Sequence, residues 1–213
     1  MKIGIYGGSF NPVHYGHVNL ARRAIADLSL DLIIVVPASV SPFKVNDAPG
    51  REICPWSRMD FVTAAFSDIE KVRVDDREIK RGGVSYTIDT VREIISENGQ
   101  GEYFFIIGED SLAGLDRWKD IEELKRLVTF KAYPRTEESS SEIRRLFEAA
   151  GVVLNPDKKI ADAVAAGVLR KKGYCPCRLK PLPEFFCPCD EFKGQMADDS
   201  YHGPCHCRLY IKP

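Results

Sequence analysis

The stretch that most constrains the fold of this chain is residues 7–17, GGSFNPVHYGH. A short apolar run at 3–6 precedes it, and an amphipathic segment at 18–28 follows it. Apolar runs of this length are typical of strands, glycine-rich segments of turns, and amphipathic segments of helices. A turn between a strand and a helix N-terminus presents backbone N–H groups and the helix dipole to phosphate. The stretch therefore predicts a phosphate site, with His14 and His17 where the helix begins.

Strand-like and helix-like segments alternate over the first two-thirds of the chain. Further strands are predicted at 32–36, 72–74, 103–107 and 128–132. Helices are predicted between them, at 57–66, 88–97 and 121–126. Continuous apolar runs are expected where a strand is covered on both faces. The pattern predicts an α/β fold with a doubly wound parallel sheet that binds its ligands at the carboxyl ends of the strands.

The pattern changes at residue 136. A polar segment at 136–141 is followed by two amphipathic helices, at 142–150 and 158–171, and Asn155-Pro156-Asp157 precedes the second as a cap. From Gly173 onward there are many prolines and little periodicity. We therefore expect two domains, at 1–135 and 136–213, of which the second is small, α-helical and cysteine-rich.

Net charge and hydropathy limit the kinds of partner that this chain is expected to bind. The formal net charge is −1, which favours neither nucleic acid nor an anionic membrane as a partner. No apolar run approaches the roughly 20 residues of a transmembrane helix. The chain starts with a strand-like segment instead of an export signal, so the expected location is cytoplasmic and reducing.

Six of the seven cysteines form three Cys-x-Cys pairs: Cys175 and Cys177, Cys187 and Cys189, Cys205 and Cys207. In a reducing compartment, such a concentration favours metal or redox chemistry over a disulfide scaffold. Four of the thiols could hold an iron–sulfur cluster or form a Cys₄ zinc site. Zinc sites usually use Cys-x₂₋₄-Cys, so the spacing favours iron–sulfur, and zinc stays the alternative. Cys54 stands apart and is expected to be structural.

Several motifs occur in one order: residues 7–17, Pro42-Phe43-Lys44, residues 56–59, residues 84–90, and residues 105–110 with Trp118. In this respect residues 1–135 resemble the nicotinate mononucleotide adenylyltransferase family, within the HxGH nucleotidyltransferases. The resemblance implies transfer of AMP from ATP to nicotinate mononucleotide. Mg²⁺ would be carried by the ATP phosphates and not by a protein cage.

Adenylyl transfer must hold two mutually repelling phosphates in line and neutralise the charge that builds on pyrophosphate. We expect the catalytic groups to be His14, His17 and Lys44. The expected ATP contacts are Gly7, Gly8, Ser9, Phe10, Ser141 and Arg144. The resemblance implies that Thr87 and Trp118 frame the pyridine ring and that Asp110 lies near the nucleotides. A helix cap at Asp110 and a core position at Trp118 are the alternatives.

One motif departs from the family pattern. Residues 139–144, SSSEIR, match the sequence of the family's phosphate-binding motif. They follow residue 135 almost directly, which is earlier than in the family. They are either that motif, reached by a shortened connection, or the linker and first helix of the next domain. The second interpretation keeps open the alternative of a redox protein whose N-terminal half binds nucleotide without catalysis.

Residues 142–213 resemble the catalytic subunit of ferredoxin:thioredoxin reductase, on Asn155-Pro156-Asp157 and on the order CPC, CPC, CHC. The resemblance implies a [4Fe–4S] cluster held by Cys175, Cys187, Cys189 and Cys205. It also implies a redox disulfide between Cys177 and Cys207, with His206 protonating a leaving thiolate. The implied partners are a ferredoxin-like electron donor and a thioredoxin-like or other disulfide protein. In the alternative, residues 142–213 form a structural module stabilised by zinc.

Overall fold

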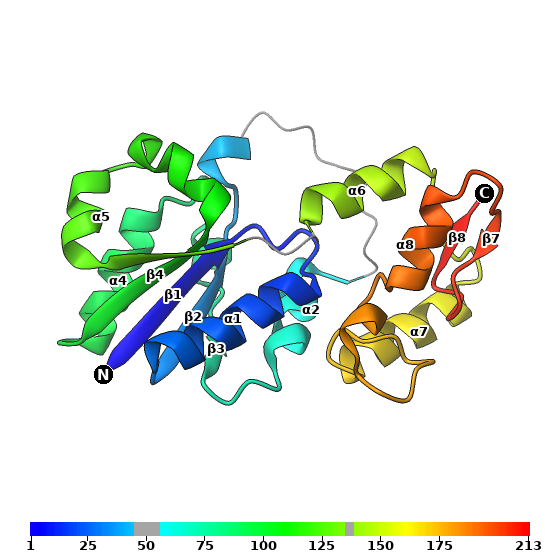
Figure 1. Cartoon of the computed structure of the whole chain (residues 1–213), viewed down its shortest axis with the longest axis horizontal. Coiled ribbons are helices and arrows are strands. Elements are labelled where there is room, and N and C mark those ends of the chain that lie inside the picture. The colour runs from blue at the N-terminus through cyan, green and yellow to red at the C-terminus, as the bar shows by residue number, and fades with distance from the viewer. Residues whose placement is uncertain (45–55, 135–138) are drawn as a thin grey trace. The chain divides into compact units, whose positions relative to one another are not determined.

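The computed structural model describes residues 1–44, 56–134 and 139–213. They form two compact units (Figure 1). The first comprises the described residues within Met1–Ser9, Gly16–Asp47 and Ile69–Glu137. The second comprises those within Phe10–Tyr15, Ala48–Asp68 and Glu138–Pro213. Among the described residues, no helix combines the length and apolar character needed to cross a membrane.

A five-stranded parallel sheet forms the centre of the first unit, in the order β3-β2-β1-β4-β5 (Figure 1). The strands are β1 (Lys2–Gly8), β2 (Leu32–Pro37), β3 (Val72–Val74), β4 (Glu102–Gly108) and β5 (Thr129–Tyr133). Every neighbouring pair is parallel. The predicted parallel sheet is thus confirmed. Strand order reverses between β1 and β4, which is where doubly wound sheets bind ligands.

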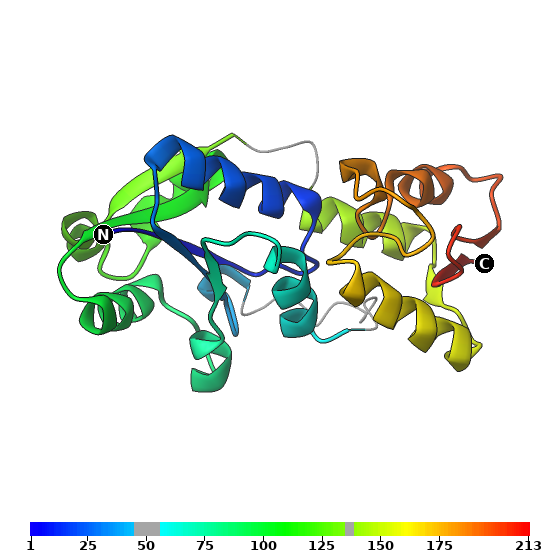
Figure 2. The ribbon, with the colours of Figure 1, turned by 90° about the horizontal axis from the view of Figure 1, so that it is seen from below.

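Helices cover both faces of this sheet, with α1 (Tyr15–Leu28) on one face and α4 (Thr87–Asn98) on the other (Figure 2). Alternate strand residues point to opposite faces. Ile3 and Ile5 of β1 therefore share a buried cluster with Val91 of α4. The remaining helical elements of this unit are η1 (Pro42–Lys44), α3 (Arg77–Arg81), η2 (Glu109–Arg117) and α5 (Ile121–Leu127).

The second unit contains helices and a small antiparallel sheet. Its helical elements are α2 (Arg58–Phe66), α6 (Ser140–Ala149), α7 (Lys158–Arg170), η3 (Pro183–Phe185) and α8 (Asp190–Ala197). Its strands are β6 (Val153–Leu154), β7 (Gly203–Pro204) and β8 (Tyr210–Lys212), in the order β6-β8-β7. The predicted cap of α7 is confirmed, since the Asp157 side chain accepts hydrogen bonds from the backbone of Lys159 and Ile160.

Two expectations need correction. The cysteine-rich segment was expected to be α-helical, but it also contains the β6-β8-β7 sheet, whose strands have only two or three residues and show no period in the sequence. The first strand was expected at 3–6, but β1 continues through Gly7 and Gly8. A glycine suits this strand because a Cβ on Gly7 would lie 3.2 Å from Cζ of Phe105.

Lys212 links the small sheet to α8. It is buried, and its Nζ donates hydrogen bonds to the backbone oxygens of Met196, at 3.1 Å, and Asp198, at 2.7 Å. Asp198 is the C-cap of α8. A cation is favourable at a helix C-terminus, where carbonyl groups lack partners within the helix.

We expect Lys212→Met to lower the free energy of unfolding by about 2 kcal/mol, because buried carbonyl groups lose a charged donor. Urea denaturation followed by circular dichroism measures this change. Lys158→Met is the matched control, because Lys158 pairs with Asp162 on an exposed helix surface. Equal urea midpoints for the two variants would contradict the role assigned to Lys212.

Candidate functional site

The carboxyl ends of β1, β2 and β4 form the edge of the first unit where the sequence places nucleotide-binding residues. Gly8 of β1 is in register with Pro37 of β2, and its carbonyl accepts a hydrogen bond from Ala38 N at 2.9 Å. Gly108 ends β4. A Cβ on Gly108 would lie 2.5 Å from Oδ1 of Asp110, so the Asp110 carboxylate folds back over the strand end.

His17 and Asp110 both lie near Tyr6. The rings of His17 and Tyr6 have their centroids 6.4 Å apart. The pKa of the Tyr6 hydroxyl is raised, first by burial and then by the negative charge of Asp110. His17 comes from the first turn of α1 and Asp110 from η2 after β4. The reversal of strand order thus brings together residues that are distant in sequence.

The residues predicted to bind the nicotinate nucleotide lie on two further elements of this unit. Thr87 is the first residue of α4. The neighbouring Ser85 is buried, and its Oγ accepts a hydrogen bond from Ser39 N at 2.9 Å. Trp118 is half-buried and packs nearly perpendicular to the rings of Phe105, at 5.6 Å, and Phe130, at 6.1 Å. Stacking of Trp118 on a pyridine ring stays a prediction.

Lys44 is the last residue of η1, and its side chain lies outside the described part of the chain. The neighbouring Phe43 is exposed, and the guanidinium of Arg117 lies 5.3 Å from its ring centroid. The phosphate role predicted for Lys44 stays a prediction.

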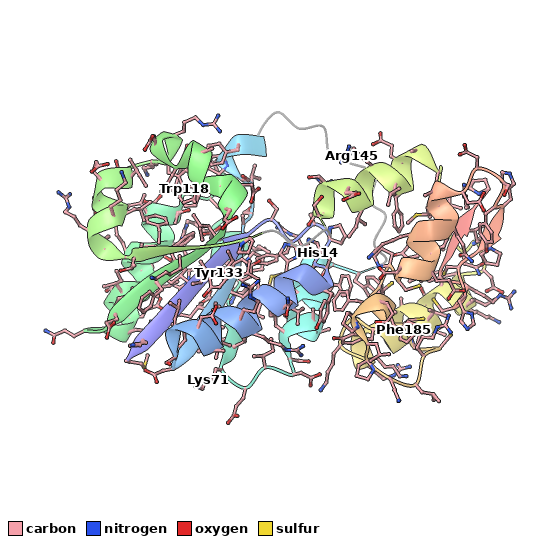
Figure 3. The ribbon with its side chains drawn as sticks, in the orientation of Figure 1. His14, Lys71, Trp118, Tyr133, Arg145 and Phe185 are labelled. Atoms are coloured by element: carbon pink, nitrogen blue, oxygen red, sulfur yellow. The ribbon has the colours of Figure 1, made fainter. Side chains whose placement is uncertain are left out.

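Residues Phe10–Tyr15, called here the histidine turn, belong to the second unit. Phe10 has a left-handed backbone with φ of 44°, and its buried side chain lies 6.2 Å from the ring of Phe66 in α2. Val13 and His14 are buried as well. His14 directly precedes α1, as Figure 3 shows.

The N-terminal end of α6 holds the histidine turn by hydrogen bonds. Ser140 Oγ donates to the backbone oxygen of Pro12 at 2.9 Å, and a guanidinium nitrogen of Arg144 donates to that of Asn11. A second nitrogen of Arg144 donates to Ser141 Oγ at 3.2 Å. Ser139 caps the helix by accepting from Glu142 N. The SSSEIR segment is therefore both a helix start and a partner of the histidine turn.

The six described cysteines of the second unit are free thiols. Cys177 is exposed and the other five are buried. The Sγ atoms of Cys205 and Cys207 are 3.6 Å apart. The predicted disulfide between Cys177 and Cys207 is not formed in this structure and stays a prediction.

The thiols of Cys175 and Cys205 both interact with that of Cys207. A hydrogen bond from Cys207 is the main reason that the pKa of Cys175 falls to about 6, with the charges of His206 and Arg178 adding to it. A hydrogen bond from Cys207 likewise lowers the pKa of Cys205 to about 7. Burial raises the pKa of Cys189, and the charges of Cys175 and Cys205 raise it further.

The arrangement of these thiols does not by itself form a metal site. Among the described residues, no group of three or more His, Cys, Asp or Glu side chains is placed to hold a metal ion. His206 is exposed, with its Nδ1 3.9 Å from a carboxylate oxygen of Glu191. The predicted cluster is therefore not confirmed.

The sequence interpretation missed several contributors to the candidate site. The role of the Asn11 and Pro12 carbonyl groups could not be predicted from the sequence, because every residue has a backbone oxygen. Tyr6 has the sequence context of an ordinary strand residue. Ser85 lies within the quoted motif at 84–90, where the buried serine could have been selected as a candidate.

Three comparisons relate this geometry to known proteins. The sequence model of the cytidylyltransferase-like family matches residues 5–165. A protein of Opitutus terrae named as a nicotinate-nucleotide adenylyltransferase is 42% identical over 130 residues, which cover 61% of this chain and 65% of that protein. A protein of the same name from Shouchella clausii is 43% identical over 136 residues. These residues cover 63% of this chain and 68% of that protein. The matched segment thus spans about two thirds of each relative.

A solved structure from Vibrio parahaemolyticus, titled with the same enzyme name, has a TM-score of 0.53 and 25% identity. The match covers 69% of this chain and 86% of that chain. The family match ends before Cys175, so it says nothing of the cysteine pairs. The parallel sheet, the histidine turn and the matched residues agree: the chain belongs to the cytidylyltransferase-like family, with the nicotinate-nucleotide adenylyltransferases as its relatives.

Proposed function

We propose that this protein transfers AMP from Mg-ATP to nicotinate mononucleotide, giving the dinucleotide and pyrophosphate. The observation that carries the proposal is the contact of Ser140 and Arg144 with the histidine turn. A helix N-terminus and a guanidinium in contact with the backbone of Pro12 and Asn11 support a triphosphate site at this turn. The names of the relatives support the same reaction.

The reaction needs positioning and charge neutralisation. The phosphate of the mononucleotide attacks the α-phosphorus of ATP, the bond to the β-phosphate oxygen breaks, and pyrophosphate leaves with its electron pair. His14, His17 and Arg144 donate hydrogen bonds to the phosphate oxygens, and Lys44 adds a point charge. Mg²⁺ enters with the ATP phosphates and lowers the repulsion between them. No side chain forms a covalent intermediate in this mechanism.

We assign the acceptor nucleotide to the carboxyl edge of the first unit. Trp118 is half-buried, so it can keep its core contacts and offer part of its indole to a pyridine ring. Thr87 at the start of α4 and Asp110 after β4 provide polar groups at the same edge of the sheet. The alternative, a module that binds nucleotide without catalysis, assumed that the SSSEIR segment lies too early in the sequence to serve the site. The contact of Arg144 with Asn11 argues against that assumption.

A second function is proposed for the cysteine pairs, on the observation that six free thiols lie in one unit and that the Sγ atoms of Cys205 and Cys207 are 3.6 Å apart. Cys175, Cys187, Cys189 and Cys205 are all buried and offer only sulfur, which fits the donor chemistry of a [4Fe–4S] cluster. Such a cluster, when bound, supplies single electrons. We propose that exposed Cys177 meets a disulfide protein such as a thioredoxin-like partner, that buried Cys207 is its redox partner, and that a ferredoxin-like protein is the donor.

We expect His17→Ala to slow pyrophosphate release from Mg-ATP and nicotinate mononucleotide by at least about 100-fold, because a donor to the transition-state charge is lost. A coupled pyrophosphate assay measures the rate. His202→Ala is the control, since His202 is exposed and its ring contacts the backbone oxygen of Pro213. A rate for His17→Ala within threefold of the wild-type rate would refute the catalytic role.

We expect Arg144→Met to weaken Mg-ATP binding about tenfold or more, because the triphosphate loses a charged donor. Isothermal titration calorimetry measures the dissociation constant. Arg145→Met offers a matched control, because Arg145 is the exposed next residue of α6 (Figure 3). If both variants bind Mg-ATP equally well, the SSSEIR segment is a helix start without a phosphate role.

We expect anaerobic purification to yield a brown protein with iron and inorganic sulfide in equal amounts. Elemental and sulfide analysis measures this, and Cys187→Ala is expected to lose most of both because a ligand is missing. Cys177→Ala should retain the iron, since Cys177 is assigned to electron exchange. A colourless protein with stoichiometric zinc would exclude the redox function and support the zinc-stapled alternative.

A further inference from the structure

Trp118, labelled in Figure 3, has a cationic residue on each side in the sequence, and each cation lies against an aromatic ring. On one side, Arg117 lies on the ring of Phe43, which is 50% exposed. On the other side, the ammonium of Lys119 lies 4.7 Å from the ring centroid of Tyr86. A cation is attracted to the face of such a ring. Because Tyr86 packs against the buried cluster of the sheet, Lys119 has the more firmly held partner.

Lys119 has a second partner at the start of the same helix. Its Nζ lies 3.2 Å and 3.4 Å from the two carboxylate oxygens of Asp89, which is in the first turn of α4. Tyr86 is the N-cap of that helix. An ammonium on a flexible stem has three donors, so it can meet a ring and a carboxylate together. Lys119 therefore contacts the start of α4 at two points.

Arg92 extends this contact to the start of α5. Its guanidinium donates two hydrogen bonds to the carboxylate of Glu123, at 2.8 Å and 2.6 Å, and lies 3.5 Å from Oδ1 of Asp89. The carboxylate of Asp120, whose backbone is left-handed with φ of 53°, lies 3.7 Å from the same guanidinium. Exposed ion pairs are weak one by one, but a bidentate guanidinium within a network is stronger. The network holds residues 118–120, which connect η2 to α5, against α4.

These contacts join the two segments that are proposed to frame the pyridine ring. Trp118 directly precedes Lys119, and Thr87 directly follows Tyr86. The ring contacts of Trp118 come from β4 and β5, so they orient its indole on the sheet. The contact of Lys119 adds a tie from the same segment to the start of α4.

We propose that Lys119 is a positioning residue for the acceptor nucleotide, which holds Trp118 and Thr87 at the separation that the pyridine ring needs. This inference rests on the proposed adenylyl transfer and on the assignment of both residues to the acceptor. The role concerns affinity, because the pyridine ring is remote from the phosphate that reacts. Losing such a contact removes binding energy that the ground state and the transition state share, so KM rises while kcat stays the same.

Lys125 provides a matched control. The side chains of Lys119 and Lys125 are 42% and 44% exposed, and each pairs with one carboxylate that lies within 3.2 Å. The partner of Lys125 is Glu122 in the same helix, α5, whereas the partners of Lys119 belong to another element. A general effect of losing a surface lysine should therefore appear in both variants alike.

The test measures pyrophosphate release at saturating Mg-ATP with varied nicotinate mononucleotide, and the dissociation constant of Mg-ATP by calorimetry. We expect Lys119→Met to raise the KM for the mononucleotide about fivefold, with kcat and the Mg-ATP dissociation constant changed less than about twofold. Lys119→Arg keeps a cation for the ring and the carboxylate, so its KM should stay within about twofold of the wild-type value. Lys125→Met should change all three quantities less than about twofold.

A double-mutant cycle tests the ring contact itself. Tyr86→Leu removes the aromatic face and keeps an apolar side chain against the core. Its addition to Lys119→Met should raise the KM less than about twofold further, because the cation that the ring attracts is already absent.

A KM for Lys119→Met within about twofold of the wild-type value would overturn the positioning role. Equal increases for Lys119→Met and Lys125→Met would do the same, as would a lower kcat with an unchanged KM. Effects of Lys119→Met and Tyr86→Leu that multiply fully in the combined variant would show that the two side chains act independently, against the proposal. Wild-type protein that releases pyrophosphate in these cases retains the proposed function. Wild-type protein that releases none overturns the adenylyl transfer itself.

Discussion

Hydrogen bonds from the start of α6 to two backbone oxygens of the histidine turn are the contact on which the geometry of the turn depends. Ser140 and Arg144 lie more than 125 residues after Asn11 and Pro12 in the sequence, yet they satisfy the carbonyl groups of that turn. Pro12 is buried, and a buried carbonyl needs such a partner, while the bond to the exposed Asn11 has a charged donor, which makes it the stronger kind. The geometry of the turn is therefore set by α6 as much as by its own sequence.

The parallel sheet explains why His17 and Asp110 both lie near Tyr6. His17 comes from the first turn of α1, and Asp110 follows β4, the strand at which the order reverses. Trp118 is half-buried, so its core contacts are compatible with the ligand role proposed for it. Its edge contacts with Phe105 and Phe130 fix the indole and leave part of it accessible. A ring held in this way loses less conformational freedom on binding than a mobile one.

The strands and long helices could be predicted because local patterns encode them. Continuous apolar runs at β2 and β4 indicate central parallel strands, and Asp157 indicates the start of α7. The β6-β8-β7 sheet could not be predicted, since two or three residues have no measurable period. The contact of Arg144 with Asn11 depends on the tertiary approach of distant segments. The SSSEIR segment begins a helix and contacts the histidine turn, and its phosphate role stays a prediction.

The cysteine-rich segment shares the second compact unit with residues from the first third of the chain. Its aromatic residues Tyr174 and Phe186 pack on Tyr15 and Phe61, which come from the first third of the chain. The family match extends to residue 165 and so includes α6 and most of α7. The same two helices therefore serve the nucleotidyltransferase family region and the core that surrounds the thiols. The cysteine-rich segment has few aliphatic side chains, and its packing against Tyr15 and Phe61 adds buried apolar surface. The cysteine pairs thus share one compact unit with α6, the helix that contacts the histidine turn.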